Sequence, residues 1–173
     1  MGNESAIIIP IPEVEPFVGP LRLKYDAAAR LGVPAHITLL YPFYPATAAI
    51  DQIENLVAIC ASIQAFRFSF TEARRFPSTA YLHSDKSESF VRIITALMEK
   101  WPDCKPYGGS HPEIIPHLTV ADKVTAKALE EVERSLSHQL PISCMAREVW
   151  LLTSDHAGMW SKSACVRLAV NEI

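Results

Sequence analysis

The sequence lacks features that several common classes of protein require. Its 173 residues carry a net charge of −3, so it has none of the basic excess typical of proteins that coat long nucleic acids. No apolar run approaches the roughly 20 residues that a membrane-spanning helix needs. We therefore expect neither long nucleic acid nor membrane as a partner, whereas a small phosphorylated ligand held by a few local groups remains compatible.

The cysteines are few, and their spacing forms no recognisable motif. The four cysteines lie far apart, with no C-x-x-C pair and no zinc-ribbon spacing. Residues 1–16 lack the positive start and the unbroken apolar stretch of a signal peptide. We expect a soluble cytoplasmic protein with reduced thiols, without a structural metal or a cofactor.

What is present suits a globular fold that mixes helices and strands. With 49% hydrophobic and 20% charged residues, the composition argues against disorder. Apolar patterns predict strands over 5–12, 35–41, 66–73, 78–84, 117–121, 146–154 and 163–170. Helical spacing predicts helices over 47–64, with Thr47 as the N-cap, over 87–101 and over 125–140. Prolines are expected to limit residues 16–24 to short helical turns.

One short motif occurs twice. Residues 34–43 read PAHITLLYPF and residues 115–122 read IPHLTVAD, so each copy has a proline, then His-x-Thr, among apolar residues. The histidines are 81 residues apart, and a strand is predicted 30 residues after each of them. Two similar lobes, each with one His-x-Thr strand, explain this repeat, so we expect residues 1–173 to form one domain of two intertwined lobes.

Each copy places an imidazole beside a hydroxyl. Side chains alternate across a strand, so His36 and Thr38 share one face, as do His117 and Thr119, while the residues between them are buried. Two histidines that titrate near neutral pH can take and give a proton, and hydroxyls can donate to phosphate oxygens. This combination suits phosphoryl chemistry without a metal.

These motifs resemble the two-histidine (2H) phosphoesterase superfamily, and most closely its 2'-5' RNA ligase/cyclic phosphodiesterase family. The resemblance spans nearly the whole chain. It implies a bilobal α+β fold with a pseudo-twofold axis, in which antiparallel-type sheets form a central cleft. It also implies that His36 and His117 are catalytic and that Thr38 and Thr119 bind phosphate. Asp122 stands where some members carry a basic residue, which argues against ligation and against long RNA.

We therefore expect a metal-independent phosphodiesterase. Its substrates would be 2',3'-cyclic phosphate nucleotides or 2'-5' linked RNA ends, and the enzyme would be a monomer. Three aromatic residues, Tyr41, Phe43 and Tyr107, are candidates for base or ribose contacts. Two alternatives stay open: a module that binds a nucleotide or RNA end without turnover, and a metallohydrolase that uses both histidines and Asp122. The sequence leaves open which histidine is the acid and which is the base.

Overall fold

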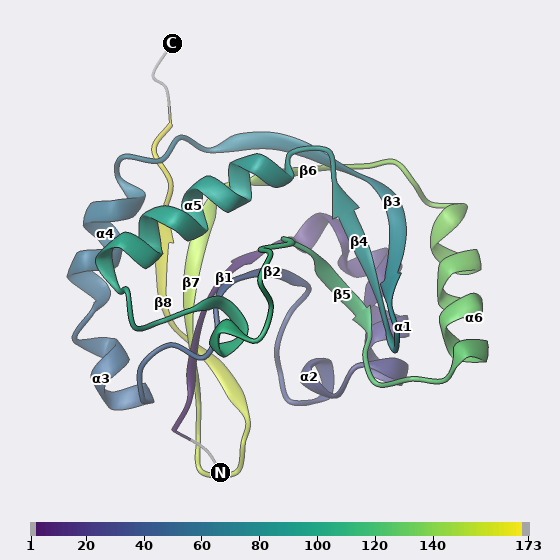
Figure 1. Cartoon of the computed structure of the whole chain (residues 1–173), viewed down its shortest axis with the longest axis horizontal. Helices are drawn as coiled ribbons and strands as arrows, with labels where there is room; N and C mark the ends of the chain where they lie inside the picture. The colour runs from purple at the N-terminus through teal and green to yellow at the C-terminus, as the bar shows by residue number, and fades with distance from the viewer. Residues whose placement is uncertain (1–2, 171–173) are drawn as a thin grey trace.

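The computed structural model describes residues 3–170, which form an α+β fold with two antiparallel sheets (Figure 1). The sheets have strand orders β2-β1-β7-β8 and β5-β4-β3-β6. The first sheet consists of β1 (Ser5–Pro10), β2 (His36–Leu40), β7 (Glu148–Ser154) and β8 (Trp160–Arg167). The second consists of β3 (Phe66–Phe76), β4 (Thr79–Ser84), β5 (Leu118–Ala121) and β6 (Ile142–Ala146). The expected fold class is confirmed.

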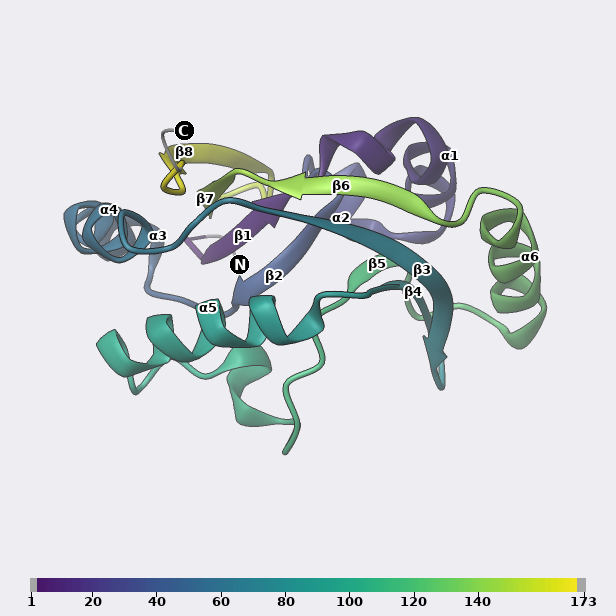
Figure 2. The same ribbon diagram turned by 90° about the horizontal axis from the view of Figure 1, so that it is seen from above.

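The helices cover the sheets according to where their apolar faces point. Alpha helices α1 (Glu15–Tyr25) and α6 (Ala126–Ser137) pack on the second sheet, with α2 (Ala27–Arg30) following α1. Helices α3 (Ala46–Ile50), α4 (Ile53–Cys60) and α5 (Ser87–Lys100) pack on the first sheet. Two short 3-10 turns, η1 (Pro12–Val14) and η2 (Pro106–Gly109), complete the described elements. Figure 2 shows α6 and α3–α4 at opposite ends of the molecule.

The chain crosses between the sheets in a repeated way. After β2, the chain passes through α3 and α4 and enters β3, which lies in the other sheet. After β5, it passes through α6 and β6 and then enters β7, which lies in the first sheet. The strand expected 30 residues after His117 is β7. The two halves of the chain therefore exchange strands, and β2 and β5, each at a sheet edge, pack beside each other.

Two predictions of helices were wrong, and one strand was not predicted. Residues 16–24 are part of the continuous helix α1, although Pro20 lies inside it and removes one backbone donor. The buried side chains of Val18 and Arg22 anchor this helix, so tertiary packing overrides the local cost. The strand β6 was not predicted, because its short PISCMA segment alternates only small or moderately apolar residues after a proline.

The helix predicted over 47–64 is two helices. Thr47 lies inside α3, whose N-cap position is Pro45, and the helices meet near Gln52. The side-chain oxygen of Gln52 accepts hydrogen bonds from Trp101 Nε1 at 3.0 Å and from Asn55 Nδ2 at 3.1 Å. Asp51 and Gln52 form the turn between the helices, with ψ of −12° and −2°. Ile50 and Val57, two apolar residues of the predicted helix, are 44% and 47% exposed.

None of the helices within residues 3–170 has the length and apolar character needed to cross a membrane.

Candidate functional site

The two His-x-Thr segments are held at the meeting edges of the sheets. His36 opens β2, where it pairs with Pro10 across the strand, and His117 lies directly before β5. The residues on the opposite faces of the strands anchor in the core: Ile37, Leu39, Leu118 and Val120 are fully buried. The alternation predicted from the motif is therefore present in both strands, and it leaves the histidines and threonines on the other face.

Both imidazoles are oriented by the same backbone bond. The Nδ1–H of His36 donates to the Pro34 carbonyl at 2.7 Å, and the Nδ1–H of His117 donates to the Ile115 carbonyl at 2.7 Å. In each neutral imidazole the proton is thus on Nδ1, and Nε2 is the acceptor. In both rings, Nε2 is therefore the nitrogen that can accept or donate a proton in a reaction.

The surroundings of Nε2 differ between the two units. The Thr38 hydroxyl lies 3.1 Å from Nε2 of His36 and donates to it. His117 instead lies among aromatic rings: Phe76 and Tyr81 have centroids 5.2 Å away, and Tyr107 stacks at 5.7 Å with planes 19° apart. The Thr119 hydroxyl makes no hydrogen bond to another group within residues 3–170.

Burial favours the neutral form of both histidines. It lowers the pKa of His36 from 6.5 to about 4, against the opposing effect of the Pro34 carbonyl. Positive charge on Arg22 and on His117 lowers the His36 pKa further, which places the two imidazoles within electrostatic reach of each other. Burial also lowers the pKa of His117, while the Ile115 carbonyl and the Asp122 carboxylate act to raise it.

The three aromatic candidates fall in different places. Tyr107 stacks on the His117 ring. Tyr41 donates its hydroxyl to Glu4 Oε1 at 3.1 Å and packs edge-on against Trp160. Phe43 packs against Tyr44 and Trp101 at the margin of the hydrophobic core. Only Tyr107 of these three is brought to the histidines.

A buried ion pair behind His36 was not recognised in the sequence. The Arg22 guanidinium contacts Asp26 Oδ2 at 2.8 Å, and their side chains are only 2% and 7% exposed. Arg22 Nη1 also donates to the Val33 carbonyl at 3.1 Å, while Asp26 Oδ1 accepts from the Ala28 N–H at 3.0 Å. The pair thereby fixes the segment that leads into His36. Its only sequence signal was an Arg and an Asp four residues apart on a helix.

Asp122 has a structural partner in place of a metal-ligand cluster. Its Oδ1 accepts a hydrogen bond from the Thr79 hydroxyl at 2.7 Å. Within residues 3–170, no group of three or more His, Cys, Asp or Glu side chains is arranged to hold a metal ion. The donor set of the metallohydrolase alternative is thus not assembled in the part of the chain described.

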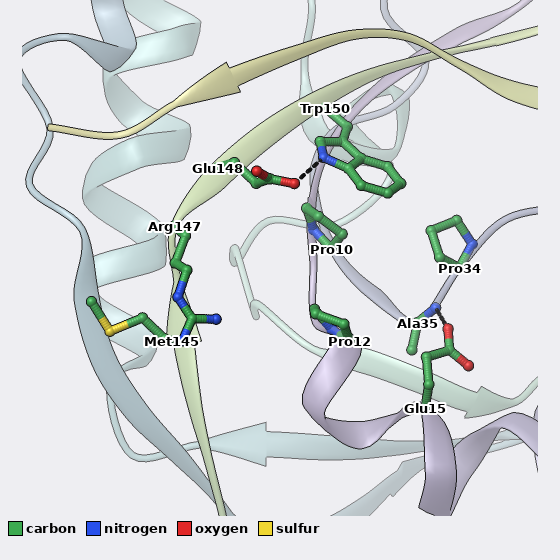
Figure 3. Close-up of a pocket in the computed structure, with 9 residues that line it drawn as sticks. All are labelled: Pro10, Pro12, Glu15, Pro34, Ala35, Met145, Arg147, Glu148 and Trp150. Carbon is green, nitrogen blue, oxygen red and sulfur yellow. Dashed lines mark hydrogen bonds between the residues drawn. The ribbon is translucent and has the colours of Figure 1, made fainter. Parts of the chain in front are cut away.

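A cavity of about 260 Å³ is lined in part by Pro34 and Ala35, the two residues before His36 (Figure 3). It is lined by Pro10, Pro12, Glu15, Pro34, Ala35, Met145, Arg147, Glu148 and Trp150. Its polar groups are largely engaged: Arg147 pairs with Glu13 at 2.9 Å, and Glu148 accepts from Trp150 Nε1 at 2.6 Å. Neither histidine lines this cavity, so the candidate site rests on the two His-x-Thr units and not on the cavity.

Residues 10–158 match the 2'-5' RNA ligase superfamily in a comparison with protein families. The chain therefore belongs to the 2'-5' RNA ligase superfamily, and this membership supports an enzyme of the phosphoesterase type. A comparison with curated proteins finds no match.

Solved structures show the same fold at low sequence identity. E. coli LigT complexed with 3'-AMP is 15% identical with a TM-score of 0.65, over 98% of this chain and 99% of LigT. E. coli LigT complexed with NADP+ is 17% identical with a TM-score of 0.62, over 97% and 98%. TT0787 of Thermus thermophilus is 15% identical with a TM-score of 0.65, over 98% and 100%.

Proposed function

We propose that this protein is a metal-independent phosphodiesterase that opens 2',3'-cyclic phosphates of nucleotides or cleaves 2'-5' linked RNA ends. The observation that carries the proposal is the identical mounting of the two imidazoles. Each donates Nδ1–H to a carbonyl two residues earlier at 2.7 Å, which leaves Nε2 for chemistry in both, and the strands β2 and β5 pack beside each other. A pair of imidazoles mounted in this way suits general acid–base catalysis.

In the proposed reaction, one histidine removes a proton from water as the water oxygen attacks phosphorus. The bond between phosphorus and one ribose oxygen breaks, and the other histidine protonates that leaving oxygen. The product is a phosphomonoester with a free ribose hydroxyl, and the proton balance is restored when the two imidazoles exchange protons with solvent. No metal or cofactor takes part.

The pKa values support a division of roles. Because burial lowers the pKa of His36 to about 4, this imidazole is neutral near neutral pH and suits the base. His117 then acts as the acid, and the anionic phosphate would help it to hold its proton. Thr38 and Thr119 would donate to the non-bridging oxygens as charge builds in the transition state.

The proposed ligand is a small nucleotide or an RNA terminus. The net charge of −3 gives no basic surface excess for a long nucleic acid. Crystals of E. coli LigT with 3'-AMP and with NADP+ show that a protein of this fold holds small nucleotides. The proposal treats residues 1–173 as one domain of two intertwined lobes, working as a monomer, which size-exclusion chromatography with light scattering would test.

The proposed location is the cytoplasm. All four cysteines, Cys60, Cys104, Cys144 and Cys165, are free thiols, as expected in a reducing compartment.

A turnover screen tests the proposal. The substrates are 2',3'-cyclic nucleotides and short 2'-5' and 3'-5' linked RNAs, all in the presence of EDTA. We expect hydrolysis of at least one cyclic or 2'-5' linked substrate. Binding of these nucleotides without turnover would favour the non-catalytic module instead, and turnover that requires added metal would favour the metallohydrolase.

A further inference from the structure

Tyr107 lies on the loop before the second histidine, in the turn η2, which packs against β2, the strand of the other histidine–threonine unit. Its ring stacks on the His117 imidazole, with 5.7 Å between the centroids and 19° between the planes. His111 meets the same ring edge-on at 6.0 Å. The Tyr107 ring therefore contacts two imidazoles.

The loop holds Tyr107 in an uncommon backbone conformation. Its φ of 53° and ψ of 33° lie in the left-handed region, which residues other than glycine rarely adopt. Gly108 and Gly109 follow with φ of 62° and 74°, and the Gly108 N–H donates to the Lys105 carbonyl at 3.0 Å. Residues held in such conformations cluster at functional sites, so we expect the Tyr107 side chain to have a function.

The stacked ring is neutral. Burial raises the pKa of Tyr107 to about 12, so the phenol keeps its proton. A neutral ring on one face of the His117 imidazole keeps water away from it, and burial is the main cause of the lowered pKa of His117.

We propose that Tyr107 is a positioning residue for His117: its stacked ring fixes the orientation of the imidazole and shields it from water. On this account, the ring holds Nε2 of His117 in the orientation in which it gives its proton to the leaving oxygen. The kinetic part of this inference rests on the proposed function, whereas the part about the imidazoles does not.

Two variants separate the ring from the hydroxyl, and NMR titration of the imidazole signals reads both effects. Tyr107→Ala removes the stacked ring and admits water, so the pKa of His117 rises towards 6.5, because burial is the main cause of its lowering. Tyr107→Phe keeps the stacked ring, so the pKa of His117 should stay as it is in wild type.

Tyr25→Phe is the matched control. It also removes one phenol hydroxyl, which donates to Glu131 Oε2 at 2.9 Å on the exposed surface. This variant should leave both imidazole pKa values unchanged. If Tyr107→Ala leaves the pKa of His117 unchanged, as this control does, Tyr107 does not position His117 and the inference is wrong, whether or not the protein turns over substrate.

Kinetics supplies the second readout. Tyr107→Ala should lower kcat/KM about 10- to 100-fold, because the His117 imidazole loses its fixed orientation, and Tyr107→Phe should keep kcat/KM close to wild type. Unchanged kinetics in Tyr107→Ala would contradict the catalytic consequence. If the imidazole pKa values shift as expected in a protein that hydrolyses none of the screened substrates, the positioning role stands and the proposed function fails.

Discussion

The histidine–threonine unit on β2 and the unit at β5 share a backbone and differ in what surrounds the imidazole. In both, Nδ1–H donates at 2.7 Å to a carbonyl two residues earlier. Around His36 the neighbours are polar, with the Thr38 hydroxyl on Nε2 and the Arg22–Asp26 pair behind. Around His117 they are three aromatic rings.

Under the proposed function, this difference gives two matched units unlike chemical roles. The matched strands place two imidazoles at equivalent positions, as a pair of catalytic groups would require. Acid–base catalysis also requires one neutral and one charged imidazole, and identical surroundings would not separate them. On that proposal the residues outside the motif decide the division of roles, and four experiments test the difference between the two units.

The largest effect should come from removing either imidazole. His36→Ala and His117→Ala should each lower kcat/KM about 10²- to 10⁴-fold, because each removes a positioned acid or base. His138→Ala, which removes an exposed histidine at the end of α6, is the control and should be close to wild type. Thermal melts would establish that the variants are folded. A folded variant of either histidine with wild-type activity would contradict its catalytic role.

Removing a threonine hydroxyl should have a smaller effect. Thr38→Val and Thr119→Val each lose one bond to a charged phosphate, for an expected decrease in kcat/KM of about 10- to 150-fold. The comparison predicts a further difference. Thr38→Val also removes the donor at Nε2 of His36, so NMR titration should show a higher pKa for His36. Thr119→Val should leave the pKa values of both imidazoles unchanged. If both variants have the kcat/KM of wild type, the two hydroxyls have only a structural role in their strands.

A stability effect should be visible between pH 6.5 and 4. Because the pKa of His36 is about 4 in the folded protein and 6.5 when unperturbed, the unfolded chain binds a proton in this window that the folded chain does not. The contribution of this site to stability is therefore full above pH 6.5 and falls as the pH falls towards 4. The loss amounts to about 3 kcal/mol, from 1.36 kcal/mol per pKa unit.

His36→Gln removes this titration, so urea unfolding at pH 7 and pH 4.5 should show a smaller decrease in the free energy of unfolding than in wild type. His117→Gln is the paired variant and should change the decrease in the same direction, since burial lowers the pKa of His117 as well. Identical acid dependence in wild type and His36→Gln would mean that His36 is not kept neutral by burial.

Much of the fold could be predicted because its strands have simple patterns. The continuous apolar run of β1, the alternation at the start of β3 and the amphipathic face of α5 all express burial directly in the sequence. The boundaries of α3 and α4 could not be predicted, because the break depends on a bond from Trp101 to Gln52 that joins distant residues. The strand β6 could not be predicted either, because its own sequence has only a weak strand pattern and it is stabilised by pairing with β3, which is distant in the sequence.

The site was predictable only as far as the repeat reaches. His36, Thr38, His117 and Thr119 follow from two copies of one motif. Loops and packing decide the remainder: three aromatic candidates were equivalent in sequence, and only Tyr107 is carried to His117 by the loop over η2. The unequal surroundings of the two histidines come from residues of α1, β3 and β4, which no local pattern connects to the motif.

The most direct test of the paired-histidine account is the pH dependence of turnover on a 2',3'-cyclic nucleotide in EDTA. The account predicts activity in EDTA and a bell-shaped profile of kcat/KM, with limbs that belong to the coupled pair. Since kcat/KM reports the free enzyme and burial lowers both imidazole pKa values, the maximum should lie below pH 6.5. The profile of kcat should lie at higher pH, because the bound phosphodiester anion stabilises imidazolium. A rate that rises steadily to alkaline pH, or that is lost in EDTA, would indicate a metal-bound hydroxide and contradict the account.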